Sequence, residues 1–207
     1  MYRNILLISL SILLTGSLVQ VKAQNNIQAN QERMQWFDEA RLGIFIHWGI
    51  YAVNGIDESW SFFNGYISHE DYMKQMKGFT AKKYDPERWA ELIKNSGAKY
   101  AVLTSKHHDG VALWPTRCND RHFDRDYISP FVQAIREEGL KAGLYFSLLD
   151  WSHQDYPNFT REEKRYQDDP KRWDKFVEFN FCQLEEIMDK YDPDLYWFDG
   201  DWEQSAE

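Results

Sequence analysis

Four short runs of apolar, β-branched and aromatic residues recur along the chain. They cover residues 42–48, 99–105, 141–148 and 195–199. Apolar runs of this length, bounded by turn-forming residues, are typical of strands that are buried on both faces. The pattern therefore predicts four buried β-strands.

Helix signals lie between these strands. Asp85-Pro86 offers an N-cap followed by a proline in the first turn, and Gly97 stands where the helix would end. Ser129-Pro130, with Gly139 as its stop, repeats this arrangement, and Asp169-Pro170 repeats it again. Helices that alternate with strands predict a parallel sheet with helical crossovers.

Two architectures fit this alternation: an open doubly wound sheet and a (β/α)₈ barrel. The residues after the first strand are Ile46-His47-Trp48-Gly49 and not a glycine-rich phosphate turn, which disfavours a dinucleotide-binding sheet. We predict an α/β fold of the (β/α)₈ TIM-like barrel type. A whole barrel takes about 250 residues, so about the first four β/α units are expected here.

The first residues have the pattern of a secretory signal peptide. Arg3 precedes an apolar run over residues 5–19, and Val21-Lys22-Ala23 resembles a cleavage site. The run is shorter than the roughly 20 residues that a membrane span needs. We expect residues 1–23 to be removed and residues 24–207 to be exported without a membrane span. The destination is periplasmic, extracellular or lysosomal, with the periplasm or secretion favoured.

Composition and net charge limit the classes of molecule that this protein is expected to bind. Aromatic residues make up 16% of the chain, which suits either a large aromatic core or a cleft that binds sugar rings. A net charge of -9 disfavours nucleic acids and anionic membranes as partners. Cys118 and Cys182 could pair, but they lie far apart in the sequence. Two buried thiols are the favoured expectation.

Polar residues gather where the predicted strands end. His47 ends the first strand, His107 and His108 follow the second, Tyr145 lies near the end of the third, and Asp199 ends the fourth. The carboxyl ends of barrel strands carry the active site. The sequence therefore predicts an active site at this rim.

The residue types favour carbohydrate chemistry over metal chemistry. Strand alternation puts Trp197 and Asp199 on one side, which suits a sugar ring held against a nucleophile. In an extended chain His107 and His108 would point to opposite sides, so they would not share one ion easily. We expect no metal and no cofactor, and imidazoles that hydrogen-bond to sugar hydroxyls.

Several segments together resemble glycoside hydrolase family 29, the α-L-fucosidases. The likeness covers about residues 32–207. The segments are Trp36-Phe37, the run from Leu42 to Gly49, the run from Tyr100 through Lys106-His107-His108-Asp109-Gly110, the run from Gly143 to Ser147, and Trp197-Phe198-Asp199-Gly200.

This resemblance implies a retaining exo-acting α-L-fucosidase that hydrolyses fucosylated glycans by double displacement. Asp199 matches the family's nucleophile, and Asp201 is the alternative if the match is shifted. The matches to residues lining the fucose pocket are His47, Trp60, His107, His108, Tyr145 and Trp197. The family's usual Glu-Trp pair is Ser59-Trp60 in this chain, with Glu58 displaced by one position.

The resemblance also implies that the catalytic acid/base lies beyond Glu207. Residues 24–207 are then the N-terminal half of a catalytic barrel, a truncated form that we expect to be inactive alone. Two alternatives stay open. One is a non-catalytic fucose- or glycan-binding protein on the same barrel, and the other is a metal-dependent barrel hydrolase.

Overall fold

The computed structural model describes residues 31–200 and 202–203. The predicted signal segment and Asp201 lie outside the described residues. The chain divides into two units, residues 1–41 and residues 42–207. The described part of the first unit contains a helix over residues 31–39. The second unit carries all the elements considered below.

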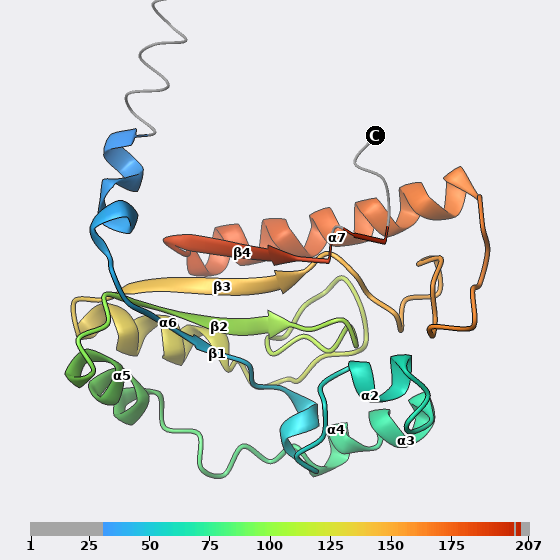
Figure 1. The fold of residues 1–207 in the computed structure, drawn as a ribbon, viewed down its shortest axis with the longest axis horizontal. Coiled ribbons are helices and arrows are strands. Elements are labelled where there is room, and N and C mark those ends of the chain that lie inside the picture. Colours follow the sequence, from blue (N-terminus) through green and yellow to red (C-terminus); the bar gives the residue numbers. More distant parts are fainter. Residues whose placement is uncertain (1–30, 201, 204–207) are drawn as a thin grey trace, which may run out of the picture. The chain divides into compact units, whose positions relative to one another are not determined.

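A four-stranded parallel sheet forms the centre of the second unit, in the order β1-β2-β3-β4. The strands are β1 (Gly43–Ile46), β2 (Tyr100–Lys106), β3 (Lys141–Ser147) and β4 (Leu195–Asp199). All four arrows in Figure 1 point toward the same end of the sheet. The four predicted strands and their parallel order are confirmed.

Three longer helices alternate with the strands: α5 (Pro86–Asn95), α6 (Ile128–Glu137) and α7 (Pro170–Tyr191). The Asp85 side chain accepts a hydrogen bond from the Arg88 backbone N–H, and Asp169 accepts one from Arg172. These two predicted caps are confirmed. They satisfy backbone donors that the first helical turn leaves without partners.

The predicted cap of α6 is wrong. The carboxylate of Asp126, and not Ser129, caps this helix by accepting hydrogen bonds from the backbone N–H groups of Ile128 and Ser129, at 2.9 and 3.0 Å. A carboxylate two residues upstream reaches both donors, so the helix begins at Ile128. Ser129 is left inside the first turn, where its hydroxyl donates to Asp126 Oδ2.

Four short helices between β1 and β2 were not predicted. They are η1 (Ile50–Ala52), α2 (Trp60–Phe63), α3 (His69–Met73) and α4 (Gln75–Gly78). Helices of three to five residues are too short to show an apolar stripe in the sequence. Figure 1 places α2, α3 and α4 beyond the arrowheads of the strands.

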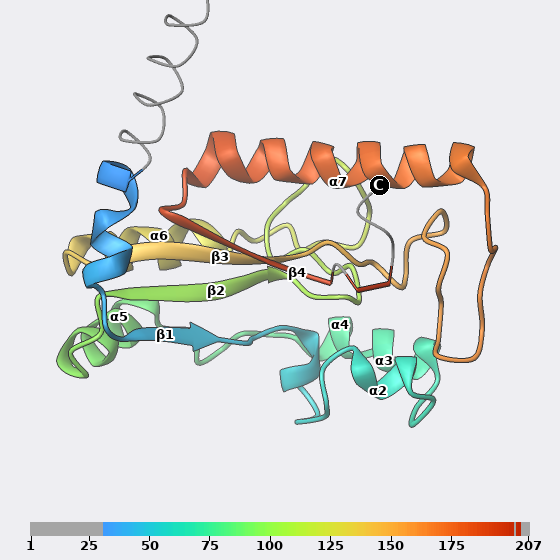
Figure 2. The same cartoon turned by 45° about the horizontal axis from the view of Figure 1, so that its top comes forward.

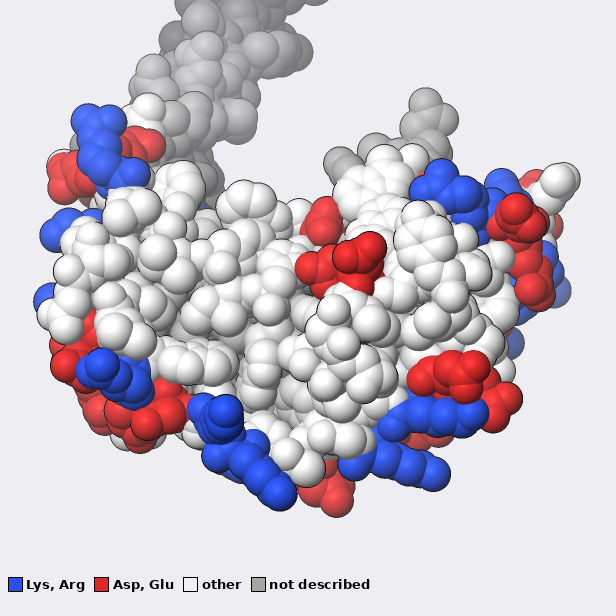
Figure 3. Space-filling model, turned by 60° about the horizontal axis from the view of Figure 1, so that its bottom comes forward, with Lys and Arg blue, Asp and Glu red and all other residues white. Residues whose placement is uncertain are grey.

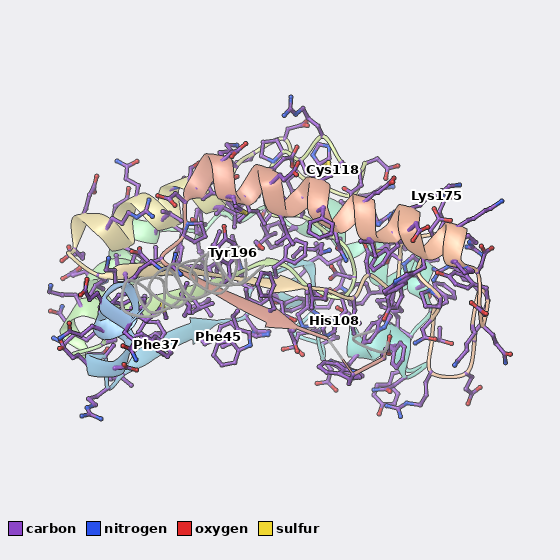
Figure 4. All side chains as sticks on the ribbon, turned by 90° about the horizontal axis from the view of Figure 1, so that it is seen from above. Phe37, Phe45, His108, Cys118, Lys175 and Tyr196 are labelled. Atoms are coloured by element: carbon purple, nitrogen blue, oxygen red, sulfur yellow. A yellow bond between two sulfur atoms is a disulfide. The ribbon has the colours of Figure 1, made fainter. Side chains whose placement is uncertain are left out.

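The two faces of the sheet differ. Leu103, Leu144 and Phe146 are buried in a core shared with Phe131 of α6 and Phe176 of α7. Figure 2 shows α6 and α7 on the same side of the sheet. Figure 4 shows Phe45 projecting away from α7 on the opposite face. Within the described residues, α6 and α7 thus cover one face of the sheet, and Phe45 lies on the other.

A disulfide joins Cys118 to Cys182, so the expectation of two thiols is wrong. Figure 4 shows Cys118 beside α7. The segment after β2 packs there because Glu186 of α7 accepts hydrogen bonds from the Trp114 indole and the Arg117 backbone N–H, at 3.0 and 2.9 Å. This packing brings the two cysteine Cα atoms to 6.1 Å across a sequence separation of 64. A disulfide is typical of proteins that fold in oxidising compartments.

Replacing both cysteines, Cys118→Ser with Cys182→Ser, is expected to lower the free energy of unfolding by about 4 kcal/mol. This is the chain-entropy value for a closed loop of this length. Denaturant unfolding of the oxidised protein measures it. A reducing agent should bring the wild type down to the level of the double variant and leave that variant unchanged. Equal midpoints for all these samples would contradict the stabilising bond.

Candidate active site

Asp199 is held at the end of β4 by a phenol from β3. The parallel register pairs Tyr145 with Trp197 and Ser147 with Asp199. Tyr145 donates a hydrogen bond from its hydroxyl to Asp199 Oδ2 at 2.7 Å. Burial raises the pKa of Tyr145 well above its usual range, and the hydrogen bond and charge of Asp199 raise it further. The phenol therefore remains a donor, while the Asp199 side chain is 27% exposed and open to a ligand.

His108 lies beside the same carboxylate. Its Nδ1 is 2.6 Å from Ser147 Oγ, and the Ser147 hydroxyl donates to the Leu149 carbonyl at 2.7 Å. Since the serine proton is committed to Leu149, Nδ1 of His108 must donate to Ser147. This bond fixes the neutral tautomer with its lone pair on Nε2, which faces Asp199 Oδ2 at 3.8 Å.

Burial lowers the pKa of His108 to about 4, although the charge of Asp199 opposes the shift. At neutral pH two acceptors, the imidazole Nε2 and the carboxylate, therefore face one another. Such a pair suits a ligand hydroxyl, which can donate to one acceptor and receive a hydrogen bond from a third group.

His107 and His47 extend the imidazole group. The His107 ring lies 5.5 Å from the His47 ring and 5.6 Å from the Tyr145 ring. A hydrogen bond joins His107 Nδ1 to the buried Ser59 hydroxyl. Burial lowers the pKa of both histidines, and for His47 the charges of Glu58 and then Asp199 act in the opposite direction. Neutral imidazoles from two strand ends thus surround Tyr145.

The expectation that His107 and His108 point to opposite sides is wrong. Strand β2 ends at Lys106, and the chain then turns, so the two rings lie 4.2 Å apart.

The Thr104 hydroxyl of β2 holds the segment that follows β1. It accepts a hydrogen bond from the Trp48 N–H at 2.8 Å and donates one to the Trp48 carbonyl at 2.6 Å. Within residues 31–200 and 202–203 no group of three or more His, Cys, Asp or Glu side chains is placed to hold a metal ion.

A buried network lies under this turn. Asp109 accepts hydrogen bonds from the Tyr72 hydroxyl at 2.6 Å and the Val111 N–H at 2.9 Å. Burial raises the pKa of Asp109 to about 6. The carboxylate of Asp150, fully buried, pairs with Arg121 at 2.9 Å. These bonds hold the loops after β2 and β3 in one arrangement.

The two tryptophans expected in the site lie on different sides of it. Trp197 is 46% exposed, and its ring is 4.9 Å from Phe45. Trp60 begins α2, and its ring is 5.7 Å from His108. The sequence reasoning missed Phe45, although its spacing of two from His47 within the predicted strand over residues 42–48 was a usable signal.

Ser59 and Ser147 were also missed as partners of the histidines. Ser147 follows Tyr145 by two residues, so strand alternation could have placed it on the same face. Ser59 has no such signal, because it reaches His107 from the segment before α2.

Figure 3 shows a face whose Lys and Arg side chains lie near its margin, while its middle is mainly uncharged and holds a few acidic side chains.

The fold and this arrangement define a class of protein. Four parallel strands in sequential order, joined by helical crossovers and with a polar site at their carboxyl ends, have the arrangement of the first half of a (β/α)₈ barrel. Known proteins make this assignment specific.

The sequence matches the α-L-fucosidase family over residues 15–207. It is 35% identical over 191 residues to an α-L-fucosidase of Branchiostoma floridae, covering 81% of this chain and 41% of that protein. It is 34% identical to a tissue α-L-fucosidase of Bos taurus, covering 81% of this chain and 39% of that protein.

Solved structures of α-L-fucosidases are also similar to this chain. α-L-Fucosidase isoenzyme 1 from Paenibacillus thiaminolyticus superposes with a TM-score of 0.75 at 36% identity, covering 84% of this chain and 44% of that one. A family 29 α-L-fucosidase from Bacteroides thetaiotaomicron, solved as a trapped covalent intermediate with 2-fluoro-fucosyl fluoride, gives a TM-score of 0.72 at 33% identity, covering 83% and 42%.

The chain belongs to the α-L-fucosidases of glycoside hydrolase family 29. It spans about two fifths of the length of the curated relatives that it matches. None of the helices in the described ranges has the length and apolar character of a membrane span.

The buried imidazole predicts a dependence of stability on pH. The folded pKa of His108, about 4, lies below the 6.5 of an ordinary histidine, so the unfolded chain takes up the proton first as the pH falls. The stability due to neutral His108 is complete above pH 6.5 and is lost between pH 6.5 and 4. The stability advantage of the wild type over His108→Asn should therefore shrink by up to about 3 kcal/mol over this window.

Denaturant unfolding at several pH values between 7.5 and 4 measures this difference. Gln133→Asn, on the exposed surface of α6, is the control, and the wild type's advantage over it should not change with pH because neither side chain titrates. An advantage over His108→Asn that stays constant with pH would sink the neutral-imidazole assignment.

Proposed function

We propose that this protein is a retaining, exo-acting α-L-fucosidase that removes terminal α-L-fucose from glycans. The observation that carries the proposal is the Asp199 carboxylate at the carboxyl end of β4, which is partly exposed, held by Tyr145 and flanked by His108. A nucleophile needs this combination of fixed orientation and open access. Membership of the fucosidase family supports fucose as the sugar.

The proposed reaction has two displacements. Asp199 attacks the anomeric carbon, the glycosidic bond breaks, and a carboxylic acid protonates the leaving oxygen as a fucosyl ester forms on Asp199. That acid, now a carboxylate, then takes a proton from water, and the water oxygen attacks the anomeric carbon and frees Asp199. The trapped covalent intermediate of the Bacteroides relative supports such an ester.

Each of the other site residues has a role in this proposal. Tyr145 occupies Asp199 Oδ2, so the attack falls to Oδ1. Nε2 of His108 receives a hydrogen bond from a sugar hydroxyl, and His47 and His107 bind further hydroxyls. Hydrogen bonds that tighten as the sugar becomes oxocarbenium-like lower the barrier more than bonds of constant strength. Trp60 and Trp197 offer apolar walls to the ring.

We further propose that residues 24–207 form the N-terminal half of the catalytic barrel of an exported protein, after a signal peptide over residues 1–23. The acid/base carboxyl then comes from beyond Glu207 and lies about 5–5.5 Å from Asp199 in the closed barrel. Fucosylated glycans or glycoconjugates are the substrates. Residues 24–207 alone should hydrolyse no fucoside.

Asp199→Asn in the complete protein is expected to lower the rate of fucoside hydrolysis by about 10³-fold or more, because an amide is a poor nucleophile. Asp168→Asn, in an exposed segment before α7, is the matched control and should keep wild-type activity. Mass spectrometry after treatment with 2-fluoro-fucosyl fluoride should find one added sugar on the peptide with Asp199 in the wild type and none in the variant.

An adduct on another carboxylate would move the nucleophile away from Asp199, with Asp201 the first position to inspect. A wild-type protein that binds fucose and forms no adduct would favour the non-catalytic alternative. Loss of activity with a chelator would favour a metal-dependent hydrolase.

A further inference from the structure

Two groups of aromatic rings meet at His108. The inner ring cluster consists of Phe45, His47, His107, Tyr145 and Trp197, and it surrounds the Tyr145–Asp199 hydrogen bond. The tryptophan cluster consists of Trp60, Trp151 and Trp202. The His108 ring lies 4.2 Å from His107 of the first group, and 5.7, 4.7 and 6.0 Å from Trp60, Trp151 and Trp202 of the second.

The tryptophan cluster lies farther along the strand direction than the two rings nearest Asp199 in the sequence of β3 and β4. Tyr145 and Trp197 of the inner ring cluster lie within strands. Trp60 begins α2, Trp151 follows β3 and Trp202 follows β4, so the tryptophan cluster lies past the strand ends. A terminal sugar held at Asp199 must direct the rest of its glycan outward, beyond the strand ends.

The Trp202 ring is both packed against the protein and exposed to solvent. It stacks on Trp60 with ring centres 6.4 Å apart and an angle of 17°, yet it stays 55% exposed. The next residue anchors its loop, because Glu203 Oε2 accepts hydrogen bonds from the Tyr156 hydroxyl at 2.6 Å and the Trp151 indole at 3.1 Å. An exposed aromatic ring that is already held in place costs little entropy when a ligand packs on it.

We propose that Trp202, supported by Trp60, is the binding platform for the sugar to which the fucose is attached. The ligand is a pyranose unit whose apolar face packs on the indole as the leaving group of the reaction. This inference rests on the proposed function and extends it to the part of the substrate that departs. Trp202 thus governs the preference for glycan substrates, while Asp199 and the histidines act on fucose.

Two substrates of the complete protein separate these roles. The trapping rate with 2-fluoro-fucosyl fluoride reports on the fucose pocket alone, because its leaving group is a fluoride ion. Hydrolysis of a fucosylated disaccharide also reports on the leaving sugar. Trp202→Ala should lower kcat/KM for the disaccharide by about tenfold or more and change the trapping rate by less than about threefold.

Trp202→Phe keeps a ring and should recover much of the disaccharide activity. Tyr66→Ala removes another exposed ring, 70% exposed and outside both clusters, and should change neither rate. The inference is overturned if Trp202→Ala leaves disaccharide hydrolysis unchanged, or if it slows trapping and hydrolysis equally. A wild-type protein that forms no adduct would instead overturn the proposed function.

Discussion

The site depends on the register between β3 and β4. Pairing of Tyr145 with Trp197 and of Ser147 with Asp199 puts the phenol and the carboxylate on the sheet face opposite α6 and α7. A slip of one residue would turn Asp199 toward the helices, since successive side chains of a strand point to opposite faces. The buried contacts of Leu144 and Phe146 on the helix side oppose that slip. The core that stabilises the sheet therefore also orients the candidate nucleophile.

Burial gives the histidines their chemistry. Removing an imidazole from water penalises its charged form, which lowers the pKa of His107 and His108. Their hydrogen-bond partners, Ser59 and Ser147, are neutral, whereas a carboxylate partner would favour the charged imidazole. A neutral imidazole keeps a nitrogen lone pair that can accept a hydrogen bond from a sugar hydroxyl, and a protonated imidazole has none.

Sequence reasoning succeeded where the signal is local. The strands are continuous apolar runs, and the caps Asp85 and Asp169 stand directly before prolines, so both could be predicted. It failed where a contact depends on the packing of segments that are far apart in the sequence. The Cys118–Cys182 bond depends on how the β2–α6 segment packs on α7, and the hydrogen bond from Ser59 to His107 crosses 48 positions. The expectation that functional residues lie at the carboxyl ends of barrel strands predicted the position of the site. It could not show that the chain turns after Lys106 and brings the rings of His107 and His108 together.

The exposed apolar residues of the sheet connect folding with catalysis. In the described structure β1 and β4 are the edges of the sheet, and Phe45 and Trp197 on these strands are 38% and 46% exposed. Free edges and apolar surface of this kind are costly in water. The same two rings belong to the wall around Asp199. On the proposed barrel, the strands that cover these edges would also close the pocket and exclude water from Asp199. Barrel closure would then be driven by burial of the pocket wall itself, and the nucleophile would become effective only when the fold is complete.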